Sequence, residues 1–145
     1  MTADFTLTLT SSDSSGFLNF RAEVACRGFS GRTAFSYSER DLAAFLAEAR
    51  AVHLGTQNSA QMIGGWEDAS ERLRLRLTPA GPFGHFQASV RIADTGPRPD
   101  QWQRVDTEFV CPPEALAGFL TAIQRLAADR TPGSATLTGD PDAIA

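Results

Sequence analysis

Apolar and polar residues alternate one by one in several segments of this chain, and this alternation constrains the fold more than any other feature. In RLRLRL, residues 72–77, leucine alternates with arginine, and HFQASVRIA, residues 85–93, continues the pattern with Phe, Ala, Val and Ile at every second position. Successive side chains of a β-strand point to opposite faces, so this period predicts strands. Such regular alternation is typical of an antiparallel sheet with one covered face and one face in water.

The same period predicts five further strands. They span residues 5–10, 17–28, 33–37, 59–66 and 102–111. SSDSSG, GFSG and DTGPRPDQ separate some of them and contain the Gly, Pro, Asp and Ser that favour turns.

Two segments carry apolar residues at helical spacing instead. In residues 38–55 Ser38 is suited to an N-cap and Gly55 to a helix end, and in residues 112–130 Pro113 is suited to a helix start. The predicted apolar stripes are Leu42, Phe45, Leu46, Ala49 and Val52 in the first helix, and Leu116, Phe119, Leu120, Ile123 and Leu126 in the second.

The predicted order is therefore βββαββββα. We predict an α+β fold in which two helices pack on one face of an antiparallel sheet of about seven strands. Residues 1–128 form a single domain in this prediction, and residues 129–145 form a flexible C-terminal tail in which ATLT, residues 135–138, is able to add a short edge strand.

Composition and charge narrow the classes of function. The 145 residues carry a formal net charge of −4, which argues against a surface that neutralises nucleic-acid phosphates. No apolar run approaches the roughly 20 residues that span a bilayer, and the N-terminus lacks the basic start and apolar block of a signal peptide. We expect a cytoplasmic protein that binds neither nucleic acid nor membrane and is a monomer or a weak homodimer.

The residues with metal-binding or catalytic chemistry are few. Cys26 and Cys111 lie within apolar-patterned segments and are expected to be reduced core thiols. His53 follows the first helix stripe, where it can interact with the helix dipole or pack against the core. His85 follows the turn AGPFG, in which Gly81, Pro82 and Gly84 favour a tight connection, and we expect it to be structural. No pair of these residues has metal-ligand spacing, so we predict no metal and no cofactor.

An acidic loop is the best candidate for a binding site, although a merely solvated loop remains the simpler interpretation. GWEDASE places Trp66 beside Glu67, Asp68 and Glu71. An exposed tryptophan is a favoured interface anchor, and acids steer a basic partner. We predict that these residues, together with Trp102, contact a partner.

The arginines of RLRLRL share one face. We expect Glu23, Asp106 and Glu108 to project from the same side of the sheet and to form cross-strand ion pairs with them. The chain contains no G-x-S-x-G elbow, phosphate-binding loop or dinucleotide fingerprint. We therefore predict that it is not an enzyme.

Three segments taken in order resemble a known family. They are GFSGRTAFSYSERDLAAFLAEARAVHLG, RLRLRLTPAGPFGHFQASVRI and FVCPPEALAGFLTAIQRL, and the resemblance covers residues 17–127 in outline. Together they resemble the WapI-type immunity proteins of bacteria and related small bacterial proteins of unknown function, with a departure in CPPEAL before the last helix.

The resemblance implies a cytoplasmic protein that binds and neutralises the toxic domain of a polymorphic bacterial toxin without catalysis. The alternative is a small-molecule binding module with a ligand held between sheet and helices. Against that alternative, the inward-facing residues are bulky enough to fill the space: Phe20, Phe35, Phe45, Leu75, Phe86, Phe109 and Phe119.

Overall fold

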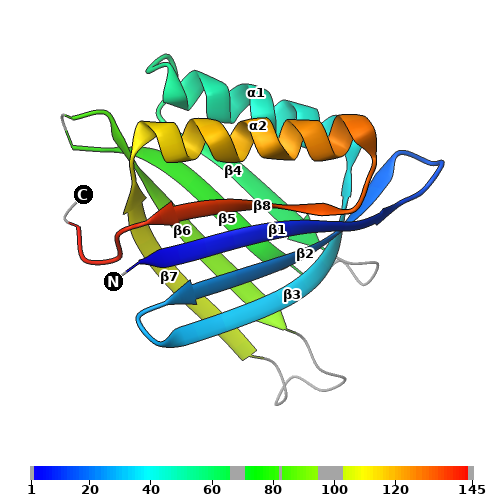
Figure 1. Cartoon of the computed structure of the whole chain (residues 1–145), viewed down its shortest axis with the longest axis horizontal. Coiled ribbons are helices and arrows are strands. Elements are labelled where there is room, and N and C mark those ends of the chain that lie inside the picture. Colours follow the sequence, from blue (N-terminus) through cyan, green and yellow to red (C-terminus); the bar gives the residue numbers. More distant parts are fainter. Residues whose placement is uncertain (1, 66–70, 82, 95–102, 144–145) are drawn as a thin grey trace.

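The structure is a computed structural model, and it describes residues 2–65, 71–81, 83–94 and 103–143. The elements are β1 (Ala3–Ser12), β2 (Phe17–Cys26), β3 (Phe29–Ser38), α1 (Glu39–His53), β4 (Ala60–Gly65), β5 (Glu71–Ala80), β6 (His85–Asp94), β7 (Gln103–Cys111), α2 (Pro113–Asp129) and β8 (Gly133–Gly139). Figure 1 shows them in their arrangement. The predicted α+β class is confirmed.

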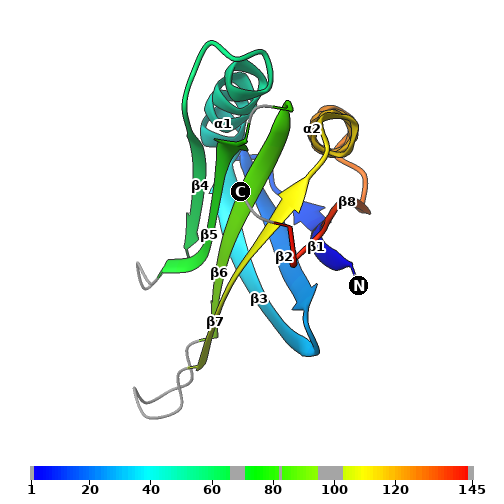
Figure 2. The ribbon, with the colours of Figure 1, turned by 90° about the vertical axis from the view of Figure 1, so that its left-hand side faces the viewer.

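The strands form one antiparallel sheet in the order β7-β6-β5-β4-β3-β2-β1-β8. A single residue pair, Ser36 with Gly65, joins β3 to β4, whereas the neighbouring strands pair over most of their length. The sheet bends at this junction into a front half, β8-β1-β2-β3, and a back half, β4-β5-β6-β7 (Figure 2).

A glycine allows the close approach of the two halves at the bend. A Cβ added to Gly64 would lie 2.3 Å from Cδ2 of Phe35, whose ring is fully buried. The Phe35 ring therefore packs directly on the backbone of β4, and it stacks at 5.6 Å on Phe20. Only glycine leaves room for the ring at this position.

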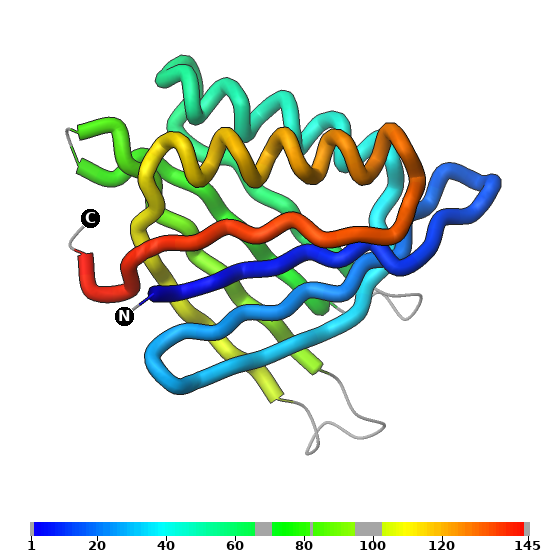
Figure 3. Tube along the Cα trace, viewed as in Figure 1, coloured from blue at the N-terminus to red at the C-terminus, as the bar shows by residue number. Residues whose placement is uncertain are grey.

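The far ends of the sheet meet each other at one point. Val110 at the end of β7 exchanges two backbone hydrogen bonds with Asp140, which follows β8, at 3.0 and 2.8 Å. A Cβ on Gly139 would lie 2.4 Å from Cδ2 of Phe109 and 2.5 Å from the carbonyl oxygen of Val110. Figure 3 shows the end of β8 crossing the end of β7 there.

The two helices lie side by side on the inner, apolar face of the bent sheet (Figures 1 and 2). The predicted N-cap is confirmed, because the Ser38 hydroxyl accepts a hydrogen bond from the Asp41 N–H at 3.0 Å. Pro113 opens α2, as predicted. The buried residues of the helices are Leu42, Phe45, Ala49 and Val52 in α1, and Leu116, Phe119, Leu120 and Ile123 in α2.

The core between sheet and helices is built from large apolar side chains. The rings of Phe5 on β1 and Phe119 on α2 meet edge to face at 5.9 Å. All seven residues expected to fill this space are buried: Phe20, Phe35, Phe45, Leu75, Phe86, Phe109 and Phe119.

The C-terminal region, predicted to be a flexible tail, contains the edge strand that the segment ATLT allowed. Residues 133–139 form β8, which pairs with β1 from Gly139 opposite Ala3 to Gly133 opposite Leu9. Ala135 and Leu137 are buried and anchor it to the core. The sheet thus has eight strands, and the observed order ends with a strand after the second helix.

Among the described residues, no helix combines the length and the apolar character that crossing a membrane requires.

Candidate protein-binding face

The outward-facing side chains of the back half form a polar surface, which we call the outer face. The strand register places them in rows across the sheet, with Arg74 opposite Arg91 and Arg91 opposite Asp106 in one row, and Ser89 between Arg76 and Glu108 in the next. The outer face comprises Gln61, Ile63, Arg72, Arg74, Arg76, Gln87, Ser89, Arg91, Arg104, Asp106 and Glu108, with Glu71 at its margin.

Arg74 and Arg91 lie directly opposite each other, and like charges in such a pair destabilise a sheet. Each is neutralised by an acid, Arg74 by Glu71 on its own strand and Arg91 by Asp106 on the neighbouring strand. Arg74 lies 2.8 and 2.9 Å from the two Glu71 oxygens, and Nε of Arg91 lies 2.8 Å from Oδ1 of Asp106. Arg104 binds the second oxygen of Asp106 at 2.9 Å. The row is therefore a chain of alternating charges interrupted by one like-charged pair.

Within this row, Asp106 acts on the ionisation of Arg91. The hydrogen bond that Arg91 donates to Asp106, and then the negative charge of that carboxylate, raise the pKa of Arg91 above its ordinary value. These groups are 33% to 58% exposed, so solvent screens the pairs and each stabilises the fold only slightly. In the structure, the pairs place these side chains against one another on the surface.

Arg76 differs from its neighbours, because no hydrogen bond or ion pair holds its guanidinium within the described part of the chain. It is exposed and lies between Gln61 on β4 and Ser89 on β6. A hollow of about 780 Å³ opens over this region, and Arg27, Pro141 and Ala143 form its wall on the side of the C-terminus.

The outer face has the opposite sign of charge to the chain as a whole. Its described residues include five arginines and three acids, which give it a formal net charge of +2, whereas the whole chain carries −4. The acids needed to make the chain negative lie elsewhere. The positive charge of this face would attract a partner with an acidic surface.

The predicted partner-binding residues have different outcomes. Trp66, Glu67, Asp68 and Trp102 lie outside the described residues. Glu71 is the first residue of β5 and is engaged by Arg74 at the margin of the outer face.

The expected pairing of the RLRLRL arginines is partly wrong. Asp106 and Glu108 lie on the outer face, but Asp106 pairs with Arg91 and Arg104, and Arg74 pairs along its own strand with Glu71. Glu23 lies on β2 in the front half, where it pairs with Arg21 at 2.9 Å. Alternation places side chains on a face, but it does not say which strands are neighbours.

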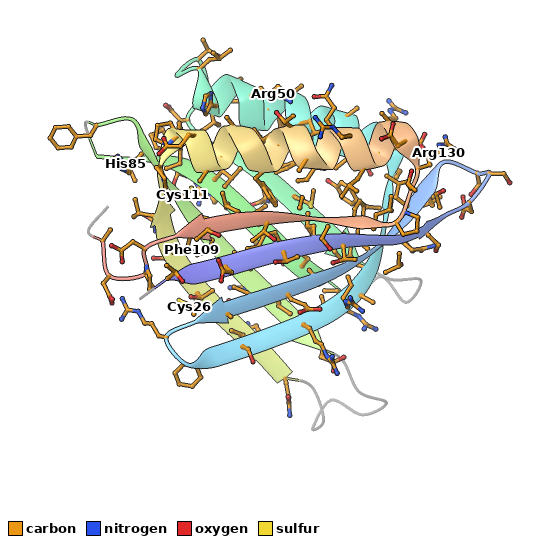
Figure 4. The ribbon with its side chains drawn as sticks, viewed as in Figure 1. Cys26, Arg50, His85, Phe109, Cys111 and Arg130 are labelled. Carbon is orange, nitrogen blue, oxygen red and sulfur yellow. The ribbon has the colours of Figure 1, made fainter. Side chains whose placement is uncertain are left out.

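The two histidines have separate surroundings. The His53 ring stacks on Phe86 at 5.6 Å, and its Nε2 lies 3.1 Å from the carbonyl oxygen of Pro113, so the predicted packing against the core is confirmed. His85, labelled in Figure 4, is the half-buried first residue of β6, opposite Ala80. Gly81 and Gly84 beside it have positive φ angles of 71° and 78°, as a tight turn requires.

The cysteines are core residues, as predicted. Both thiols are free and buried. Burial raises the pKa of Cys111 to about 12, and its thiol donates a hydrogen bond to the carbonyl oxygen of Phe86 at 3.5 Å. Within residues 2–65, 71–81, 83–94 and 103–143, no group of three His, Cys, Asp or Glu side chains is placed to hold a metal ion.

Comparison of the chain with models of protein families, with curated proteins and with solved structures finds no match.

Proposed function

We propose that the chain is a binding protein without catalysis and that its outer face contacts another protein. The observation that carries this proposal is Arg76, an exposed cation without a partner among the described residues, set in a surface whose other charges are held in place. A surface that is already ordered loses little side-chain entropy on binding. Arginine is also enriched among the residues that dominate interface energetics.

The partner in this proposal is the toxic domain of a polymorphic bacterial toxin. The support is the resemblance of the three segments in residues 17–127 to WapI-type immunity proteins. This resemblance does not identify any residue of the interface. Because the outer face has a positive net charge, we expect the toxin surface that contacts it to be acidic. Inhibition of this kind requires a rigid platform, and the closed core supplies one.

The alternative, a ligand held between sheet and helices, has less support. Side chains occupy that space, because Phe5, Phe35, Phe45, Phe109 and Phe119 are each at most 2% exposed there. Ligand sites are usually preformed concave pockets of about 300–1,000 Å³. The hollow of the outer face has a comparable volume but lies on the polar side of the sheet.

The test is protection of growing cells. Candidate toxin domains from the source organism are expressed one at a time, with or without this chain. We expect one of them to be neutralised and to copurify with the chain in a fixed ratio. If no domain is neutralised and the purified chain retains a small metabolite, the ligand-binding alternative is correct.

A further inference from the structure

The free edge of β7 is an unused strand-pairing surface. β7 ends the sheet, and in the described part of the chain Asp140 is its only backbone partner besides β6, bonded to Val110 alone. In an antiparallel strand the backbone groups of successive residues point to opposite sides. Since Val110 points away from β6, the N–H and C=O groups of Glu108, Asp106 and Arg104 also point to the free edge.

The chain itself turns away from this edge. If β8 continued in the register set by Val110 and Asp140, Asp142 would lie opposite Glu108. Instead the Asp142 N–H bonds to Oδ1 of Asp140 at 2.8 Å, and Arg27 binds both the carbonyl oxygen of Pro141 and the carboxylate of Asp142. Among the described residues, the edge of β7 therefore has no backbone partner from residue 104 to residue 108.

We propose that this edge pairs with the same edge of a second copy of the chain, in an antiparallel register centred on Asp106. Arg104 then lies opposite Glu108 of the second copy, and the two-fold symmetry repeats that pair. All three residues point their backbone groups to the free edge, so the register is consistent with full hydrogen bonding between the copies. The occupant is a second copy because the edge is complementary in charge to itself.

Exposed charges on an edge strand often prevent such pairing, and they do so by repulsion. Here the only like-charged pair is Asp106 with its symmetry mate, and each copy already neutralises Asp106 with Arg91 at 2.8 Å and Arg104 at 2.9 Å. On the inner side, Val105 and Thr107 are only half-buried, whereas the next inward residue, Phe109, is 2% exposed. A partner strand would cover this half-exposed stretch.

Antiparallel pairing puts opposed side chains on the same face, so the joined sheet would carry both outer faces on one side. The dimer does not depend on the identity of any toxin. Because the contact is a short strand edge, we expect weak association.

The experiment is sedimentation equilibrium of the purified chain at concentrations from about 10 µM to about 1 mM in low salt. We expect a monomer–dimer equilibrium that shifts toward monomer when salt is raised, because salt screens the ion pairs. Amide hydrogen exchange of Asp106 and Glu108 should slow as the concentration rises. A monomer throughout the range, with unchanged exchange, would overturn the proposal.

Charge reversals identify the surface. Arg104→Glu and Glu108→Arg each create two repulsive pairs per dimer and should weaken association about tenfold. An equimolar mixture of the two variants restores opposite charges at both positions, and it should dimerise like the wild type. Circular dichroism confirms that each variant is folded.

Arg21→Glu is the matched control, because Arg21 forms the same kind of exposed pair, with Glu23 at 2.9 Å, on a strand inside the sheet. It should leave dimerisation unchanged. A dimer that survives both edge reversals, or a mixture that does not associate, would place the contact elsewhere and contradict the proposal.

Discussion

Gly139 allows the end of β8 to approach the end of β7, and Gly139→Ala should therefore destabilise the fold. The new Cβ would lie 2.4 Å from Cδ2 of Phe109 and 2.5 Å from the backbone oxygen of Val110. A side-chain end could turn aside, but the backbone of β7 must move. That movement breaks the two hydrogen bonds between Val110 and Asp140.

The magnitude follows from these two effects. Each hydrogen bond stabilises the fold by about 0.5–1.5 kcal/mol, and overpacking a core costs about 1–3 kcal/mol. Allowing for relaxation, we expect the free energy of unfolding to fall by about 3 kcal/mol, which corresponds to a Tm lower by about 10 °C in a chain of this size.

Urea denaturation followed by circular dichroism measures the change, and Gly133→Ala is the matched control on the same strand. A Cβ there meets only the flexible end of Leu126, at 2.7 Å, and we expect a loss below about 1 kcal/mol. If Gly139→Ala costs no more than this control, the closed contact between β7 and β8 is not part of the stable fold.

Three further measurements test the core: one substitution, one titration and one thiol reaction. Gly64→Ala should lower the free energy of unfolding by about 1–3 kcal/mol in urea denaturation, because its Cβ would meet the buried ring of Phe35 at 2.3 Å; a neutral effect would contradict the packing at the bend. Tyr37 is the only tyrosine, and burial, with the charges of Asp41 and Glu48, raises its pKa to about 12. Absorbance titration of the folded protein should therefore show one ionisation of the phenol, near pH 12. Because the phenol ionises at lower pH in the unfolded chain, its contribution to the free energy of unfolding should be fully present below pH 10 and be lost as the pH rises toward 12. An ionisation near pH 10 in the folded protein would contradict the burial of Tyr37. Cys111, whose pKa is also raised to about 12, should react with a thiol reagent at pH 8 only as fast as the chain unfolds, and rapid reaction in native buffer would show an accessible thiol.

Local patterns predicted the elements of this fold well. Alternation of apolar residues identified seven strands, and the N-cap Ser38 and the first-turn residue Pro113 marked the helix starts. Each of these signals depends on residues that are close in sequence, so it can be read without knowing the neighbours in space.

The remaining features depend on contacts between distant residues. The segment ATLT allowed a short edge strand, but its partner was not marked in the sequence. β8 is held by β1, so Thr6 and Thr136, 130 positions apart, lie side by side with their hydroxyls 3.1 Å apart. The bend of the sheet depends on Phe35 finding Gly64, and nothing local marks that pair.

The candidate site was least predictable for the same reason. Arg76 and Arg74 occupy equivalent positions in RLRLRL, yet Arg74 is held by Glu71 while Arg76 has no partner in the described residues. Glu71 lies three residues before Arg74 on the same strand, whereas the register places Arg76 between the uncharged Gln61 and Ser89. The alternation of side chains leaves that register undetermined.

The most direct test of the account is the affinity of the outer face for its protein partner. The experiment uses a toxin domain that the chain neutralises. Isothermal titration calorimetry measures its affinity for the wild type, for Arg76→Glu and for Arg21→Glu. Arg21→Glu is the control, because it makes the same change of charge on the front half of the sheet. The account predicts that Arg76→Glu weakens binding at least about tenfold, the effect of losing about 1.4 kcal/mol, while Arg21→Glu changes it less than about twofold. Binding that is insensitive to Arg76→Glu, or lost with Arg21→Glu, would contradict it.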